Sequence, residues 1–174
     1  MVGLIDAKDP ANFPGARVGS QLQILSNLHE DNRVLNSRGL HDLHKIIGFS
    51  EIRFYCNRPS TGRTFHIKTD AEEVINFFMS ISPSKKAPSA CGTFSRFPDD
   101  DSIMAVSCEQ WRVNKGTVDT GQWGPQGIRD QKLNNYAVNM KDHKFVASQH
   151  GWGYCDDNGE NIRTDNGVWK WFVR

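Results

Sequence analysis

A dense group of oxygen-bearing side chains lies near the C-terminal end of the chain. Within six residues it brings together three carboxylates and two amides, Asp156, Asp157, Asn158, Glu160 and Asn161. Hard oxygen ligands at this density suit Ca²⁺, so Asp156, Asp157 and Glu160 are candidate metal ligands. The spacing is not that of an EF-hand, and Asn158-Gly159 is a strong turn signal. A hydrophilic turn without an ion is therefore the alternative.

Aromatic residues accompany this loop in glycine-rich surroundings. Trp152 and Tyr154 precede the acidic residues directly, and Trp123 lies in a second glycine-rich stretch. Sugars present flat patches of C–H groups that stack on aromatic faces, while polar neighbours take their hydroxyls. Core and loop packing is the competing interpretation. The residues expected to contact a glycan are Trp123, Trp152, Tyr154, Asp156, Asp157 and Asn158.

A second acidic cluster consists of Asp99, Asp100 and Asp101. Three adjacent carboxylates repel one another unless a cation or an arginine neutralises them. We favour a solvated turn here, because runs of like charge usually face water.

Histidines are the residues that could support catalysis. His66, His143 and His150 could join a cysteine or a carboxylate in a catalytic arrangement, which would make the protein a hydrolase. The sequence contains no Gly-x-Ser-x-Gly elbow, no phosphate-binding loop and no Gly-x-Gly-x-x-Gly motif. We therefore assign no catalytic residue and favour a role other than catalysis, with enzyme activity left open.

Four widely spaced cysteines, Cys56, Cys91, Cys108 and Cys155, include no Cys-x-x-Cys arrangement. This disfavours a zinc ribbon and a thioredoxin-like site. Three pairings are possible, and we favour Cys91 with Cys108, which bracket one loop-rich segment. Cys56 then pairs with Cys155. Four reduced thiols in a cytosolic protein are the alternative.

Helical patterns occur at two places. Residues 37–47 place their apolar side chains on one face and are followed by Gly48, a typical left-handed cap. Residues 70–80 follow a capping box of Thr69 and Glu72 and carry a second apolar stripe. Residues 18–28 fit a short helix and a buried strand equally well.

Strand patterns predict the rest of an α+β fold, with a mostly antiparallel sheet, two or three helices and a loop-rich C-terminal half. Alternation over 51–56 and 64–68, with a turn between, predicts a hairpin. Residues 1–16 show little periodicity and are expected to form an irregular lead-in. The further predicted strands are 103–111, 136–140, 144–148 and 168–174.

Composition limits the class of protein. The chain has 174 residues and is expected to form one domain over 1–174, large enough to bury roughly 70% of its unfolded surface. A net charge of +1 and a pI near 7.7 argue against a nucleic-acid-binding protein. No apolar run approaches the roughly 20 residues that span a bilayer, so no membrane span is expected. Oligomerisation stays open.

A set of segments occurs in the order found in one known module: Phe54-Tyr55-Cys56, Pro59 to Ile67, Ala90-Cys91-Gly92, Pro98 to Ser102, Cys108 with Gln110-Trp111, Cys155-Asp156-Asp157 and Trp169 to Arg174. In these segments the chain resembles a cysteine-containing module of secreted cnidarian and other marine invertebrate proteins. That module is distantly similar to intelectin and fibrinogen-related lectins.

The resemblance implies an extracellular, disulfide-bonded domain whose role is recognition of a glycan or glycoprotein surface, with Ca²⁺ as a cofactor that such lectins often use. A structural or matrix-interaction domain without a pocket is the second hypothesis. The hydrolase is the third.

Overall fold

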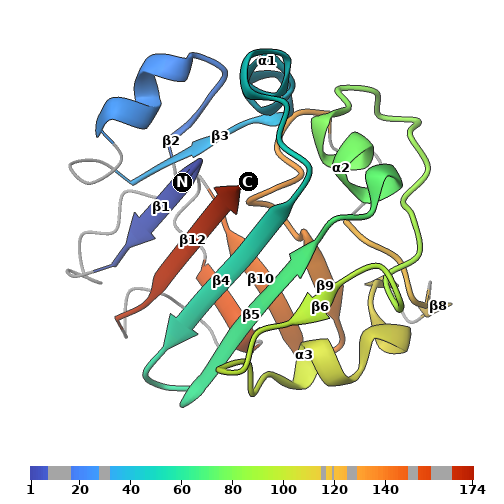
Figure 1. The fold of residues 1–174 in the computed structure, drawn as a ribbon. Coiled ribbons are helices and arrows are strands. Elements are labelled where there is room, and N and C mark those ends of the chain that lie inside the picture. The colour runs from blue at the N-terminus through green and yellow to red at the C-terminus, as the bar shows by residue number, and fades with distance from the viewer. Residues whose placement is uncertain are drawn as a thin grey trace.

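A seven-stranded sheet forms the centre of the molecule (Figure 1). The computed structural model describes residues 1–7, 17–27, 32–114, 117–118, 120–124, 129–148, 153–157 and 166–174. The strands are β1 Gly3–Asp6, β2 Arg17–Gly19, β3 Arg33–Leu35, β4 Ile52–Arg58, β5 Arg63–Thr69, β6 Ser95–Arg96, β7 Val113–Asn114, β8 Thr117–Val118, β9 Val138–Met140, β10 His143–Ala147, β11 Gly153–Asp157 and β12 Val168–Val173. The helices are α1 Ser37–Ile47, α2 Glu72–Met79 and α3 Ile103–Val106, with 3₁₀ helices η2 Leu22–Asn27 and η3 Cys108–Gln110.

The large sheet has the order β2-β3-β1-β12-β4-β5-β6, and its neighbours run antiparallel except for β2 and β3. A smaller antiparallel sheet has the order β11-β10-β9, and β7 pairs with β8. This arrangement confirms the predicted α+β class with a mostly antiparallel sheet.

The hairpin of β4 and β5 alternates between two environments. Ile52, Phe54 and Cys56 of β4 are fully buried, as are Phe65 and Ile67 of β5. The residues between them face the other side of the sheet, because successive side chains of a strand point in opposite directions. The predicted hairpin is therefore confirmed.

The C-terminal strand β12 lies inside the sheet, between β1 and β4. Trp169 and Trp171 are fully buried, and their indole N–H groups donate to the carbonyls of Tyr154 and Leu133 at 3.0 Å each. This confirms the strand predicted over 168–174. Its tryptophans belong to the core, because alternation along the strand turns both to the same face.

The irregular lead-in predicted over residues 1–16 is wrong for its first part. Residues 3–6 form β1, which pairs antiparallel with both β12 and β3. A Cβ atom at Gly3 would lie 2.8 Å from Cε3 of Trp171, so glycine lets the two strands pack closely. Four residues are too few to show a periodicity, and the partners of β1 come from distant parts of the chain. Residues 8–16 lie outside the described part.

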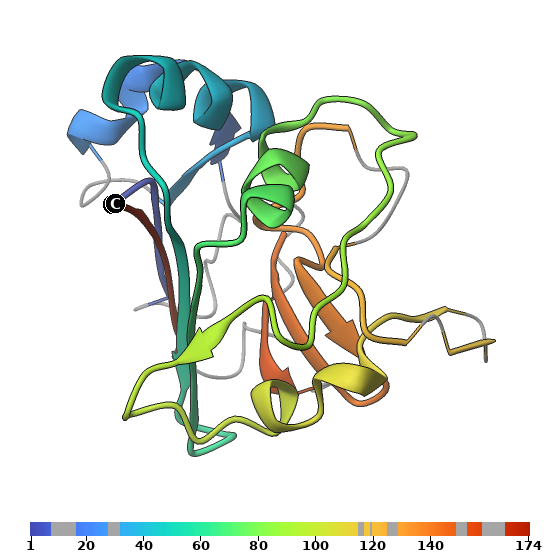
Figure 2. The same cartoon turned by 45° about the vertical axis from the view of Figure 1, so that its right-hand side comes forward.

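The large sheet is covered on one face, which we call the inner face. Figure 2 shows α2, α3 and the three-stranded sheet on the same side of it. Phe145 of β10 packs against the rings of Phe54, Phe65 and Trp171, with centroid distances of 5.7, 5.4 and 5.5 Å. Among the described elements, none lies over the central strands of the opposite, outer face (Figures 1 and 2).

Helices α1 and α2 occupy the predicted segments. The side chain of Asn36 caps the start of α1, and Gly48 ends it with φ of 63°. The capping box predicted for α2 is wrong, because its N-cap is Ala71 and the hydroxyl of Thr69 donates to the carbonyl of Thr93 at 2.6 Å. None of the helices in the described residues is long and apolar enough to cross a membrane.

The strand predicted over residues 103–111 is also wrong, because this segment forms α3 and η3. The hydroxyl of Ser102 accepts the N–H of Ala105 at 3.1 Å. The carboxylate of Asp156 accepts the N–H groups of Ile103 and Met104 at 2.9 and 3.0 Å. A short apolar run does not distinguish helix from strand, so a contact from β11 decides the outcome here.

The other predicted strands, 136–140 and 144–148, correspond to β9 and β10. Residues 18–28, which fitted helix and strand equally, are divided in the described part between β2 and η2.

Candidate ligand-binding surface

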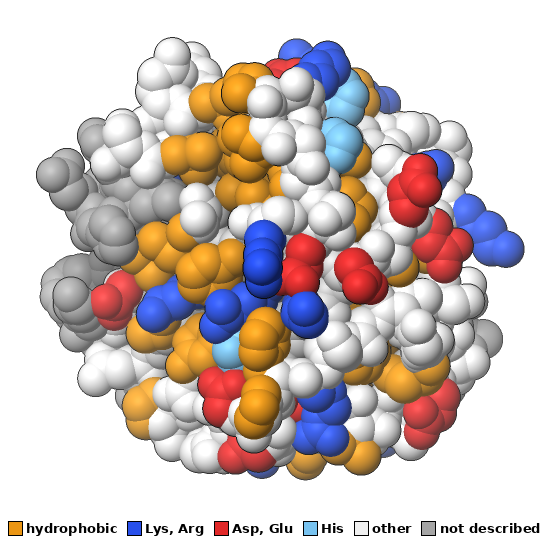
Figure 3. Space-filling model, in the orientation of Figure 1, with side chains coloured by type: hydrophobic (Ala, Val, Ile, Leu, Met, Phe, Trp, Pro, Cys, Tyr) orange, Lys and Arg blue, Asp and Glu red, His pale blue; other side chains and the backbone are white. Residues whose placement is uncertain are grey.

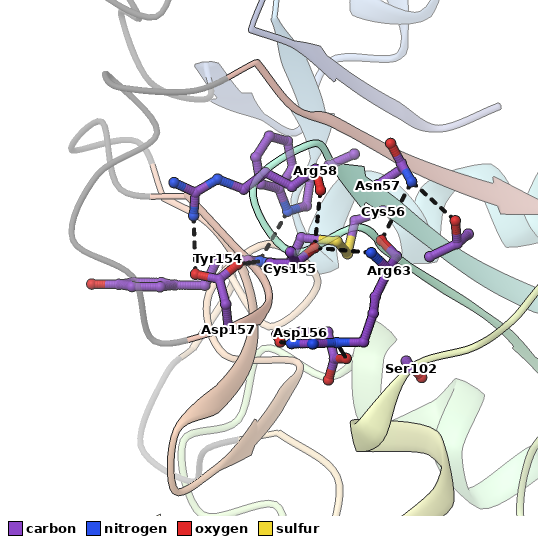
Figure 4. The surroundings of a disulfide bond; sticks show 12 residues. Cys56, Asn57, Arg58, Arg63, Ser102, Tyr154, Cys155, Asp156 and Asp157 are labelled. Atoms are coloured by element: carbon purple, nitrogen blue, oxygen red, sulfur yellow. Dashed lines mark hydrogen bonds and ion pairs between the residues drawn. A yellow bond between two sulfur atoms is a disulfide. The ribbon is translucent and has the colours of Figure 1, made fainter.

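Two disulfides join the segments that carry the predicted site. Cys56 is bonded to Cys155, and Cys91 is bonded to Cys108, with Cα–Cα distances of 5.7 and 5.4 Å. Both predicted pairings are confirmed, and the alternative of four reduced thiols is wrong. The bridge between Cys56 and Cys155 is fully buried and links β4 of the large sheet to β11 of the small one (Figure 4).

An arginine–aspartate ion pair stands on each side of that buried bridge (Figure 4). Arg58, at the end of β4, donates from Nη1 to Oδ1 of Asp157 at 3.0 Å. Arg63, at the start of β5, donates from Nε to Oδ2 of Asp156. The two aspartates are consecutive residues of β11, whereas the arginines stand at the two ends of one turn. The predicted binding residues Asp156 and Asp157 therefore hold the hairpin in place.

Asp156 is the more deeply buried of the two aspartates. A bulge in the pairing of β10 with β11 leaves it with φ of 54°, and its side chain is 0% exposed. Besides Arg63, its carboxylate contacts the N–H groups of Ile103 and Met104 and lies 3.3 Å from Nδ1 of His143. A buried carboxylate is tolerated only when such donors compensate its lost hydration. Asp156 thus joins β5, β10 and α3.

The contacts of Asp156 and Asp157 do not fit a calcium site. A Ca²⁺ ion needs several oxygen ligands that are free to converge on it. Each of these carboxylates already faces an arginine, so the pair lacks the excess negative charge that attracts a divalent cation. The third predicted metal ligand, Glu160, lies outside the described residues, and for it calcium binding stays a prediction.

In the part of the chain that the structure describes, metal-ligating side chains converge at one place, where Cys91, Cys108 and Glu109 meet. The two sulfurs are bonded to each other and cannot act as thiolate ligands. This cluster therefore supports no metal.

Two of the aromatic residues predicted to contact a glycan, Trp123 and Tyr154, lie in the described part of the chain. Trp123 is fully buried, and its Nε1–H donates to the hydroxyl of Thr93 at 2.9 Å, so the structure corrects its role to that of a core residue. Tyr154 is half-buried on β11, with Nζ of Lys144 5.1 Å from its ring centroid. Trp152 and Asn158 lie outside the described residues.

The second acidic cluster anchors β5, and the solvated turn predicted for it is confirmed for Asp99 and Asp101, which are exposed, but wrong for Asp100, which is buried. Asp100 has a fully buried carboxylate, which accepts the backbone N–H of His66 at 2.8 Å and pairs with Arg96 at 2.5 Å. Asp101 accepts a backbone N–H of β5 at 2.5 Å. Asp99 remains 58% exposed and contacts the ring of His66.

The outer face of the large sheet carries aromatic and basic side chains on its central strands. One register row joins Lys170, Tyr55 and His66, and the next joins Phe172, Arg53 and Lys68. Phe97, just after β6, stacks on the ring of His66 at 4.0 Å between centroids. Figure 3 shows basic side chains in a band among hydrophobic ones on this side of the molecule. We name these residues the cation–aromatic face: Arg53, Tyr55, His66, Lys68, Phe97, Lys170 and Phe172.

Two cations of this face rest against aromatic rings. The guanidinium carbon of Arg53 lies 4.5 Å from the ring centroid of Phe97 and 4.6 Å from that of Phe172. Nζ of Lys170 lies 5.6 Å from the ring centroid of Tyr55. Cation–π contacts attract such charges without neutralising them. The face is therefore apolar and positively charged at the same place.

His66 connects the acidic and basic parts of the face. Its Nδ1 lies 2.6 Å from Oδ1 of Asp99, and its Nε2 accepts from Nε of Arg53 at 2.6 Å. Burial lowers the pKa of His66, the hydrogen bond with Asp99 opposes this, and the charge of Arg53 adds to the lowering. Burial also raises the pKa of the nearby Tyr55 hydroxyl, and the charge of Asp99 raises it further.

The contacts of His66 bear on the hydrolase hypothesis. A general base must offer a nitrogen lone pair to the proton that it removes. Both ring nitrogens of His66 are already engaged, by Asp99 and Arg53. His143 is held by Asp156, and His150 lies outside the described residues. These geometries give the hydrolase hypothesis no support.

Three surface hollows lie elsewhere in the described part. One of about 470 Å³ lies at the start of α1, and a neighbour of about 430 Å³ shares Arg38 and Ile81 with it. The third, of about 360 Å³, is lined by Lys85 and Lys86. None of the described predicted site residues lines them.

The cation–aromatic face was not predicted from the sequence, although its signal is present there. The outward positions of β4, β5 and β12 hold arginine, lysine, histidine and aromatic residues. Alternation alone marks these positions as exposed, but not as neighbours. Their proximity depends on the pairing of β4 with the C-terminal strand.

No protein-family model, no curated protein and no solved structure matches the chain.

Proposed function

We propose that this protein is an extracellular recognition module that binds carbohydrate on its cation–aromatic face. The observation that carries the proposal is the open sheet face, on which half-buried rings and polar groups stand side by side in strand register. Sugar recognition requires apolar surface for C–H groups and polar partners for hydroxyls. Tyr55, Phe97 and Phe172 supply the first, and Lys68 and Asp99 supply the second.

The disulfides support the extracellular part of the proposal. Disulfides form and persist in oxidising compartments and are rare in the cytosol. Here all four cysteines are paired, and one pair is fully buried in the core. A chain stabilised in this way suits a protein that works outside the cell.

The anchoring of the strands supports recognition of a ligand with a defined shape. Phe172 stands on a strand that is paired on both sides, and Tyr55 stands beside Cys56, which is bonded to β11. Side chains on such strands keep their spacing, so binding orders few additional groups. A rigid sheet surface is therefore a better candidate than the acidic loop, whose two described aspartates are already bound by arginines.

The test is a glycan array with the oxidised protein, followed by calorimetry with the best ligand. Tyr55→Ala and Phe172→Ala should each weaken binding by about fivefold, because each removes a stacking surface. Tyr154→Ala is the matched control, since it removes an aromatic ring beside the acidic loop. It should leave the affinity unchanged, as should a calcium chelator.

Two results would contradict the proposal. Loss of binding in Tyr154→Ala or in chelator, with Tyr55→Ala unaffected, would place the site at the acidic loop. Absence of binding to every glycan would reject the carbohydrate function. Unfolding midpoints of all variants establish that the changes in affinity are not changes in folding.

A further inference from the structure

The charges of the cation–aromatic face indicate the chemical class of its ligand. We propose that the face takes an acidic glycan, with sugar rings that carry carboxylate or sulfate groups. This inference rests on the carbohydrate-binding function proposed above and adds the charge of the ligand to it. Its basis is the local environment of Arg53 and Lys170.

Arg53 is a positioned cation without an acidic partner. In the part of the chain that the structure describes, it contacts His66, Phe97 and Phe172 and no carboxylate. Only its Nε is used as a donor, so its two Nη groups make no hydrogen bond to a described residue. Guanidinium N–H groups match the planar oxygens of a carboxylate or the oxygens of a sulfate. The two phenylalanines already hold the group in place, which lowers the cost of binding.

Lys170 is the second such cation, and it lies diagonally across the strand pair from Arg53. Arg53 pairs with Phe172, whereas Tyr55 pairs with Lys170. Among described residues, the ammonium of Lys170 contacts the ring of Tyr55 and no carboxylate. The lysine stem is flexible, so an anion can draw the ammonium aside and free the ring for stacking. One bound group would then use both the charge and the ring.

The acids of the face are already engaged. Glu51 pairs with Lys68 at 2.7 Å, and Asp99 contacts the ring of His66 at 2.6 Å. Neither carboxylate contacts Arg53 or Lys170. Three cations, Arg53, Lys68 and Lys170, stand beside two carboxylates, Glu51 and Asp99, so the described residues leave one net positive charge on this part of the sheet. An anionic ligand supplies the missing charge.

The basic row continues beyond the face, which favours an extended ligand. Lys170 pairs with Leu4, Leu4 with Arg33, and Arg33 with Arg17, so these residues form one row across β12, β1, β3 and β2. Neighbouring strands lie about 4.8 Å apart, and three of these four strands carry a basic residue in the row. An oligosaccharide laid across the strands would pass Lys170, Arg33 and Arg17 in turn.

Single-stranded nucleic acid is the other polymer that combines anionic groups with stackable rings. Two observations favour a glycan. The disulfides indicate an oxidising compartment, and the net charge of +1 is low for a nucleic-acid-binding protein. Nucleic-acid binding therefore enters the experiment as a contrary outcome.

The experiment measures affinity by calorimetry for four probes of similar length: a sulfated glycosaminoglycan fragment, an oligogalacturonate, a neutral chitin oligosaccharide and single-stranded oligothymidylate. The protein is the full oxidised chain. One or both acidic glycans should bind, and their affinity should fall as salt is raised, because charge pairs are screened. The two acidic probes distinguish sulfate from carboxylate.

The Arg53→Gln/Lys170→Gln variant should weaken acidic-glycan binding by about tenfold or more, since it removes charge-assisted hydrogen bonds. Lys45→Gln/Lys86→Gln is the matched control, because it removes the same charge from exposed positions elsewhere. Its affinity for the acidic glycans should stay close to that of the wild type. Arg53→Lys/Lys170→Arg retains both charges and should keep a salt-dependent affinity.

The outcomes separate this inference from the proposed function. Equal affinity for neutral and acidic glycans, without salt dependence, would overturn the inference and leave carbohydrate binding intact. Binding of oligothymidylate alone, or of no probe, would overturn both. If the glutamine variant fails to fold, the inference is tested by the salt dependence of acidic-glycan affinity in the wild type and in the charge-retaining variant. Affinity that does not change with salt in either protein would overturn it.

Discussion

Asp156 and Arg63 form an ion pair that links β11 of the small sheet to β5 of the large one. The same carboxylate also accepts N–H groups at the start of α3. The carboxylate is 0% exposed, whereas the arginine side chain is 30% exposed. Beside it runs the buried disulfide between Cys56 and Cys155, and beyond that the pair of Arg58 with Asp157. Three cross-links therefore fix the hairpin of β4 and β5, whose outer side carries Arg53, Tyr55, His66 and Lys68.

Replacing Asp156 by asparagine should lower the free energy of unfolding by about 2 kcal/mol, because charge-assisted hydrogen bonds are lost. Asparagine tolerates the positive φ at this position, so the change isolates the charge from backbone strain. Chemical denaturation measures the effect. Asp42→Asn, at a half-exposed ion pair with Lys45, is the control and should change stability by less than about 1 kcal/mol. Similar effects at both positions would show that Asp156 has no special structural role.

The two disulfides should be reduced in order. Cys91 is exposed and Cys108 partly so, whereas Cys56 and Cys155 are fully buried. Exchange requires access of a thiolate to a sulfur, so mild reductant should open the first bridge in the native protein. Alkylation followed by peptide mass spectrometry identifies the reduced cysteines. Labelling of Cys56 at the same rate as Cys91, without denaturant, is the result that the structure does not allow.

Removing the disulfides should have unequal effects on stability. The bridge from Cys56 to Cys155 spans 99 residues and that from Cys91 to Cys108 spans 17. Loop-closure entropy then predicts losses of about 5 and about 3 kcal/mol for the two double alanine variants. Denaturant unfolding of each variant against wild type compares them. A larger loss for the Cys91–Cys108 pair would mean that restriction of the unfolded chain is not the dominant effect.

His66 should make stability depend on pH. Burial lowers its pKa in the folded protein below the ordinary value of 6.5. As the pH falls below 6.5, the unfolded chain binds a proton that the folded protein resists. The free energy of unfolding therefore declines below that pH and levels off once the folded-state pKa is passed. Measuring unfolding on both sides of pH 6.5 tests this.

In His66→Gln this contribution should disappear, so the variant should lose less stability on acidification than wild type. His41→Gln, on the exposed surface of α1, is the matched control and should retain the wild-type pH dependence. An identical pH profile for wild type and His66→Gln would contradict the assignment.

Local pattern was sufficient for much of the fold. The helices over 37–47 and 70–80, the hairpin and the C-terminal strand all follow from apolar periodicity, because burial of one face repeats with the geometry of the element. The same holds for the fold class. The disulfide pairs followed from one local choice, since pairing Cys91 with Cys108 left Cys56 for Cys155.

The features that the sequence did not predict depend on contacts between distant segments of the chain. Asp156 looked like a ligand for calcium, but its partners Arg63, Ile103 and Met104 come from other elements, and no spacing along the chain reveals them. The contact of Asp156 with the N–H groups of Ile103 and Met104 stabilises residues 103–106 as a helix. Pairing with β12 stabilises residues 3–6 as a strand. The cation–aromatic face exists only because β12 enters the sheet beside β4. Side chains alternate by local geometry, but which of them become neighbours is set by strand order and register, and these are tertiary properties.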